Sequence, residues 1–114
     1  MYEYRAVVKR VIDGDTIVAD FDLGFGIQYV NQTVRFLGIN TPETRTKDLV
    51  EKAAGKAAKQ FVVDLLPVGK QITIRTHIDA TGKFGRILGT IIVDEINLNE
   101  LLIKEGHAVP YMAG

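Results

Sequence analysis

The sequence predicts an α+β fold in which five strands form a small, highly twisted barrel and two helices pack against it. The main observation is the order of the segments, which is three strand-like runs, a helix, two more strand-like runs and a second helix. The second is that no internal repeat or linker interrupts the 114 residues. We therefore expect one domain over residues 1–114, long enough for a single hydrophobic core.

Three strands are expected to form an N-terminal meander over residues 2–12, 15–22 and 27–37. Between the first two, Asp13-Gly14 predicts a tight turn, because glycine adopts a positive φ without strain. Residues 22–26 contain two glycines and are expected to form a glycine-hinged loop.

The remaining elements follow from periodicity and from end signals. Apolar residues at helical spacing predict a helix over about 47–66, and the stripe consists of Ala54, Ala57, Ala58, Phe61, Val62 and Leu65. Strands are expected over 71–76 and 86–93, with a polar loop from His77 to Gly85 between them. Asn97 and Glu100 resemble a capping box that opens a short second helix, and residues 107–114 are expected to be irregular.

Bulk composition restricts the class of protein. Fourteen basic and fourteen acidic residues give a formal net charge of zero, so a polyanion would have to be met by a local patch. There is no cysteine, which excludes disulfides and thiolate metal sites. We expect no membrane contact and an intracellular location by default, with a secreted form as the alternative, because residues 1–20 contain no apolar run of signal-peptide length.

Candidate chemistry lies in three short segments at the ends of expected strands. They are Asp13-Gly14-Asp15-Thr16, the stretch from Arg35 to Thr41-Pro42-Glu43, and Lys83-Phe84-Gly85-Arg86. Together they supply carboxylates and a carbonyl, which suit a hard divalent cation, and arginines, which suit a phosphate. This combination indicates metal-assisted chemistry on a phosphodiester.

Each segment also has an ordinary structural explanation. Asp13 can simply serve the Asp-Gly turn while Asp15 caps a strand. Thr41 precedes a proline and is therefore held extended, which leaves its carbonyl available, although the same pattern fits a plain strand exit. Arg35 lies within an apolar strand, so it either points to solvent or has an anionic partner.

The two histidines carry no metal site of their own. His77 and His107 are too few and too isolated for zinc, and we expect both to be structural or surface residues.

Taken together, the segments resemble the thermonuclease family, also called staphylococcal-nuclease-like. The matching stretches are Val11 to Thr16, Val34 to Glu43, Lys83 to Arg86, Asn99-Glu100 and Gly106. The resemblance covers nearly the whole chain. It implies an oligonucleotide/oligosaccharide-binding (OB) barrel with packed helices, and calcium-dependent hydrolysis of DNA and RNA to products with 3′-phosphates.

The resemblance also implies a role for each matching residue. Asp15, Asn40 and Thr41 would form the Ca²⁺ site, Thr41 through its backbone carbonyl. Asp13 would support these ligands without contacting the ion itself. Glu43 would position or deprotonate the attacking water, and Arg35 and Arg86 would hold the phosphate. Lys83, Phe84 and Tyr111 would contact the nucleic acid substrate, with single-stranded DNA or RNA favoured.

Two departures from the family pattern qualify this expectation. Asn40 stands where the family usually has aspartate, so Ca²⁺ affinity should fall. The chain stops at Gly114, where well-studied members continue into a third helix, and self-association could compensate. The alternative to a nuclease is a non-catalytic OB-type module that binds nucleic acid or a protein partner.

Overall fold

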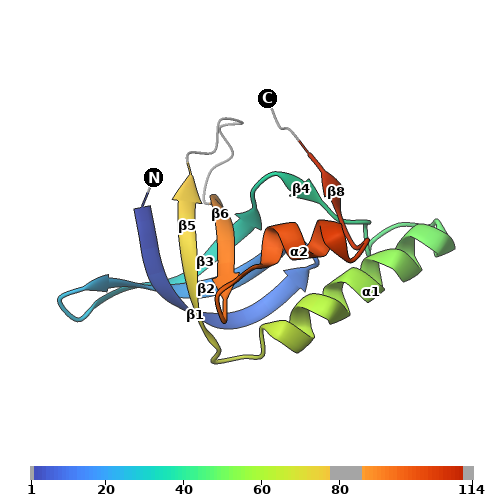
Figure 1. Ribbon diagram of the computed structural model, residues 1–114. Helices are drawn as coiled ribbons and strands as arrows, with labels where there is room; N and C mark the ends of the chain where they lie inside the picture. Colours follow the sequence, from blue (N-terminus) through green and yellow to red (C-terminus); the bar gives the residue numbers. More distant parts are fainter. Residues whose placement is uncertain (1, 78–85, 112–114) are drawn as a thin grey trace.

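Five strands form a closed barrel in the computed structural model, which describes residues 2–77 and 86–111. They are β1 (Tyr2–Asp13), β2 (Thr16–Gly24), β3 (Ile27–Phe36), β5 (Gln71–His77) and β6 (Arg86–Val93). All neighbouring pairs are antiparallel except β3 and β6, which pair in parallel between residues 33–36 and 86–89 and close the barrel. The predicted five-stranded OB-type barrel is therefore confirmed (Figure 1).

Two helices pack against the barrel, the first on β1 and the second on β6 (Figure 1). Helix α1 (Leu49–Leu65) begins after Asp48, whose carboxylate accepts hydrogen bonds from the backbone N–H groups of residues 50 and 51. Helix α2 (Leu98–Lys104) begins after Asn97, whose side chain accepts from the backbone N–H of Glu100 at 3.1 Å, as the capping pattern predicts. Neither helix of the described chain is long and apolar enough to span a membrane.

The apolar stripe of α1 is only partly buried. Ala58 and Val62 are buried in the core, and Phe61 and Leu65 pack at its edge. Ala54 and Ala57 are exposed, so the predicted stripe is wrong at these two positions. The buried face instead includes Gly55, because the loop before the helix packs directly onto its backbone.

Three two-residue strands were not expected from the sequence. They are β4 (Ile39–Asn40), β7 (Ile96–Asn97) and β8 (Val109–Pro110). β4 pairs with β8, so the segment after α2, which was expected to be irregular, returns to the end of β3 (Figure 1). Strands this short show no alternation of side chains that a sequence pattern could reveal.

The hairpin of β2 and β3 is longer than predicted and projects from the barrel (Figure 1). β2 continues to Gly24 and β3 begins at Ile27, so only Phe25 and Gly26 form the turn and the expected loop over 22–26 is wrong. Positive φ angles at residues 24–26 (82°, 56° and 74°) reverse the chain in this short space.

Gly14 forms the predicted turn for a different reason from the expected one. Its φ is not positive. A Cβ added there would lie 2.9 Å from the Cβ of Ala58 in α1 and 3.1 Å from the Cγ2 of Thr41. Glycine is required because the β1–β2 turn, helix α1 and the chain after β4 meet at this point.

Candidate active site

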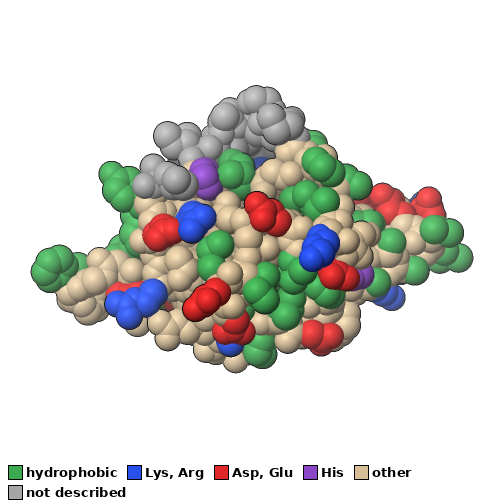
Figure 2. Space-filling model, viewed as in Figure 1, with side chains coloured by type: hydrophobic (Ala, Val, Ile, Leu, Met, Phe, Trp, Pro, Cys, Tyr) green, Lys and Arg blue, Asp and Glu red, His purple; other side chains and the backbone are tan. Residues whose placement is uncertain are grey.

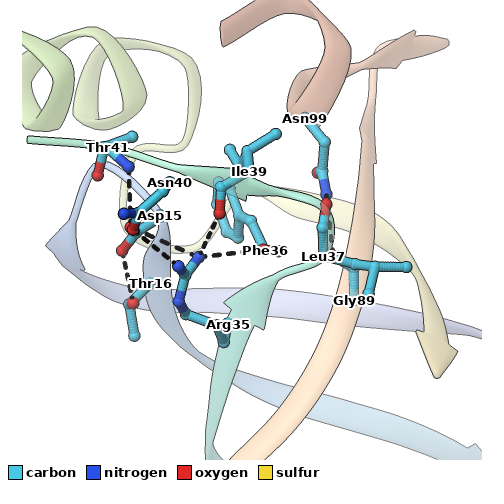
Figure 3. A network of polar contacts seen from close by, with 10 residues as sticks. All are labelled: Asp15, Thr16, Arg35, Phe36, Leu37, Ile39, Asn40, Thr41, Gly89 and Asn99. Atoms are coloured by element: carbon cyan, nitrogen blue, oxygen red, sulfur yellow. Dashed lines mark hydrogen bonds and ion pairs between the residues drawn. The ribbon is translucent and has the colours of Figure 1, made fainter. Parts of the chain in front are cut away.

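Asp15 lies in the β1–β2 turn, where its carboxylate joins two parts of the chain. The side chain is largely buried, with 8% of the residue exposed. Its Oδ1 accepts a hydrogen bond from the Thr16 hydroxyl at 2.9 Å, and its Oδ2 accepts from the backbone N–H of Thr41 at 3.1 Å (Figure 3). The carboxylate therefore fixes the segment after β4 to the rim of the barrel.

Arg35 reaches from β3 into the same group of residues (Figure 3). Its Nη1 donates to the carbonyls of Phe36 (3.1 Å) and Ile39 (3.0 Å), and its Nη2 donates to the Asn40 Oδ1 (3.0 Å). Nη1 also lies 3.4 Å from the Asp15 Oδ2, an ion pair between two largely buried side chains. Of the two alternatives that the sequence left open for Arg35, solvent or an anionic partner, the structure shows the anionic partner.

The parallel pairing of β3 with β6 places both arginines on one face. Registered neighbours in a parallel pair share a face, and Arg35 lies opposite Leu88 while Arg86 lies opposite Thr33. Because alternate residues of a strand share a face, Arg86 is on the same side as Leu88 and therefore as Arg35. Two cations from distant parts of the sequence thus face the same region.

Asn99 of α2 fixes the turn that follows Arg35. Its Oδ1 accepts from the backbone N–H of Ile91 at 3.0 Å, and its Nδ2 donates to the carbonyls of Leu37 (2.9 Å) and Gly89 (3.1 Å) (Figure 3). The amide thereby joins β6 to the end of β3. Sequence reasoning assigned Asn99 no role, although a polar residue within an apolar helical segment was a signal of a buried contact.

Glu43 is exposed on a loop that two contacts hold in place. The Thr44 hydroxyl donates to the Asp13 Oδ1 at 2.8 Å. A Cβ on Gly55 would lie 2.6 Å from the Glu43 carbonyl oxygen, so the loop backbone rests directly on α1. Asp13 accordingly anchors the loop that carries Glu43, and neither Thr44 nor Gly55 was identified from the sequence.

The oxygen atoms around Asp15 are of the type that a hard cation binds, but only one of the three groups that supply them carries a negative charge. Asp15 supplies a carboxylate, Asn40 an amide oxygen and Thr41 a carbonyl, and oxygen ligands are those that Ca²⁺ takes. The amide oxygen of Asn40 already accepts a hydrogen bond from Arg35. Over residues 2–77 and 86–111, no three His, Cys, Asp or Glu side chains form a group that could hold a metal ion.

The expected substrate contacts are placed only in part. Tyr111 follows β8, is exposed, and donates its backbone N–H to the Gly38 carbonyl at 2.9 Å, beside the turn after β3. Lys83 and Phe84 lie outside the described residues. His107 stacks obliquely on Phe61 with ring centroids 4.7 Å apart, consistent with the structural role expected of it.

An OB-type barrel with two arginines on one face and a carboxylate at its rim is a domain whose side chains suit a phosphate and a hard cation. Comparison with known proteins identifies its family. The model described as Staphylococcal nuclease homologue matches residues 33–113, which is more than half of the chain. The chain belongs to this family, and the resemblance inferred from its motifs is confirmed.

Several curated relatives are nucleases by name. The chain is 34% identical over 102 residues to the thermonuclease of Staphylococcus intermedius, covering 90% of this chain and 56% of that protein. It is 35% identical over 101 residues to the thermonuclease of Staphylococcus hyicus, covering 89% and 56%. For the endonuclease YhcR of Bacillus subtilis (strain 168) the identity is 33% over 116 residues, covering 96% and 9%. The chain thus spans about half of the thermonucleases and a tenth of YhcR.

Proposed function

We propose that this chain is a nuclease domain that hydrolyses phosphodiester bonds in DNA and RNA with Ca²⁺, leaving 3′-phosphates. The observation that carries the proposal is the shared face of Arg35 and Arg86, with the Asp15 carboxylate 3.4 Å from the first of them. The nuclease names of relatives that align with about nine-tenths of the chain or more support it.

The two arginines would bind the phosphate and stabilise the negative charge that develops on it. A guanidinium donates parallel hydrogen bonds to phosphate oxygens. Two backbone carbonyls hold Arg35 at the rim, so its guanidinium would lie beside the phosphate site before the substrate arrives.

Glu43 would act on water, because it is exposed and its backbone is fixed against α1. Its carboxylate would accept a proton as the water oxygen forms a bond to phosphorus. The bond from phosphorus to the 5′-oxygen breaks in the same step, and that oxygen takes a proton from solvent water to leave as a 5′-hydroxyl. The phosphate stays on the 3′-oxygen, which gives the proposed product.

Asp15, Asn40 and Thr41 would hold the Ca²⁺ ion, and their oxygens are of the kind it requires. When bound, such an ion polarises a phosphoryl oxygen. Because Arg35 contacts both Asp15 and Asn40, it would share these oxygens with the ion. We therefore propose weak Ca²⁺ binding that improves when a phosphate draws Arg35 toward itself.

The second candidate function is a non-catalytic nucleic-acid-binding module. The observation in its favour is Asn40, an uncharged residue at a position proposed to ligate calcium, whose oxygen is already bonded to Arg35. Such a module would bind single strands without cleaving them.

The deciding experiment measures cleavage of single-stranded DNA in excess calcium and in a chelator. We expect calcium-dependent cleavage, and we expect Glu43→Gln to lower kcat by roughly 10²–10⁴-fold, the usual contribution of a general base. Glu105→Gln is the matched control, because Glu105 is an exposed glutamate at the end of α2. No calcium-dependent product, even at millimolar ion, would favour the binding module, and an equal loss in both variants would remove the role of Glu43.

A further inference from the structure

A cleft opens at the end of the barrel where the β2–β3 hairpin projects. It has a volume of about 390 Å³, within the roughly 300–1,000 Å³ typical of ligand pockets. Its walls come from all five barrel strands, and they include Tyr4, Phe21, Leu23, Tyr29, His77 and Arg86. Neither Asp15 nor Arg35 lines it, and Arg86 is the one residue that the cleft shares with the candidate active site among the described residues.

Aromatic rings form much of this cleft. Tyr4 and Phe21 meet edge to face, with centroids 5.9 Å apart and an interplanar angle of 75°. Tyr29 lies opposite Phe21 on the neighbouring strand and is 53% exposed. Leu23 is 43% exposed on the same hairpin. The wall therefore presents the exposed ring of Tyr29 beside the half-buried ring of Tyr4, with Phe21 buried behind them.

Arg86 connects the cleft with the proposed phosphate site. Arg86 is part of its lining and also shares a face of β3 and β6 with Arg35. A chain held by its phosphates at the two arginines would therefore have its next residues beside the rings. Figure 2 shows that hydrophobic side chains also gather at the far left end of the molecule, over the projecting hairpin.

His77 adds an unsatisfied polar atom to the wall. Its Nε2 is buried and has no hydrogen-bond partner in the part of the chain that the structure describes. Leaving such an atom unpaired costs roughly 1–3 kcal/mol. Nucleobases carry ring nitrogens, carbonyls and amines, which are the kinds of group that pair with an imidazole.

We propose that this cleft binds a base of single-stranded nucleic acid that flanks the nucleotide being cleaved, by stacking it on Tyr29 and Tyr4. The proposal rests on the proposed function for the position of the cleaved bond. Stacking on aromatic rings is tolerant of sequence, since every base has a π-face. The neutral net charge agrees with this mode, because the cleft would add affinity without further cations.

The test compares substrates of two lengths in Tyr29→Ala. For a single-stranded DNA of about ten nucleotides, within the site size of an OB fold, we expect KM to rise roughly 5- to 150-fold with kcat unchanged. This is the loss of ~1–3 kcal/mol of stacking per base. For a dinucleotide, which spans only the cleaved bond, we expect kcat/KM to be unchanged.

Two variants serve as controls. Tyr29→Phe keeps the ring and should behave as the wild type. Phe25→Ala removes a fully exposed ring at the tip of the same hairpin, outside the cleft lining, and should also leave KM unchanged. Equal losses in Phe25→Ala and Tyr29→Ala, or equal effects of Tyr29→Ala on both substrate lengths, would overturn the proposal.

A second measurement separates this proposal from the nuclease activity. Fluorescence anisotropy of the labelled ten-nucleotide strand in chelator reports binding without cleavage. If the wild type cleaves nothing but Tyr29→Ala still weakens binding by the same factor, the proposed function fails and the base site stands. If Tyr29→Ala binds as the wild type, the base site is wrong. Sedimentation that shows Tyr29→Ala converting a dimer to a monomer, with binding unchanged, would assign the cleft to a second copy of the chain and also overturn the proposal.

Discussion

At the rim that carries Arg35, largely buried polar side chains make several hydrogen bonds, whereas the β2–β3 hairpin leaves Leu23, Phe25 and Ile27 exposed to solvent. A charge taken out of water must be compensated by partners, so the geometry of the rim is fixed by its contacts. The hairpin has no such constraint, because an exposed apolar side chain needs no partner. Under the proposed function, the rim would carry the chemistry and the hairpin would add affinity for the substrate.

The largest expected effect is on turnover, when Arg35 at the rim is replaced. Arg35→Ala should lower kcat/KM by roughly 10²–10³-fold, the usual loss of one preorganised charged donor. Arg35→Lys should recover only part of it, because lysine keeps the charge and lacks the planar fork. Steady-state cleavage of single-stranded DNA measures both.

Arg5→Ala is the matched control, since Arg5 is an exposed arginine of β1. Less than a tenfold loss in Arg35→Ala, with the control unchanged, would remove Arg35 from the proposed machinery. A thermal melt of each variant separates lost activity from lost folding.

The next effect concerns stability. Asn99→Ala should lower the free energy of unfolding by about 2–4 kcal/mol, because it leaves the Ile91 N–H and the Leu37 carbonyl without their buried partner. Gln28→Ala on the hairpin should change it by less than about 0.5 kcal/mol, since that residue is exposed. Urea unfolding followed by circular dichroism compares the two. Similar losses of unfolding free energy in the two variants would contradict the contrast between a rim fixed by buried contacts and an exposed hairpin.

The smallest expected effect is on calcium affinity. Asn40→Asp adds a carboxylate beside Asp15 and should tighten Ca²⁺ binding at least about tenfold, or ~1.4 kcal/mol. Asn31→Asp adds the same charge at the base of the hairpin, where Asn31 is exposed, and should have no effect. Calorimetry without substrate is the measurement. Unchanged affinity in Asn40→Asp would show that this position is not a ligand.

The order of the main elements, the five-stranded barrel and the family could be predicted from the sequence alone. Periodicity and turn residues are local signals, so the main strands and both helices lie close to their expected bounds. The family motifs are also local, and they named Asp15, Arg35, Glu43 and Arg86 as candidates.

Which of these groups meet, and which contacts hold them, depends on how the whole chain packs. The pairing of Arg35 with Asp15, the shared face of the two arginines and the closure by β4 and β8 join residues far apart in the chain. The same is true of Gly14 and Gly55, whose missing Cβ atoms allow loops to rest on α1. No local pattern encodes such contacts, because they depend on the packing of whole elements against one another.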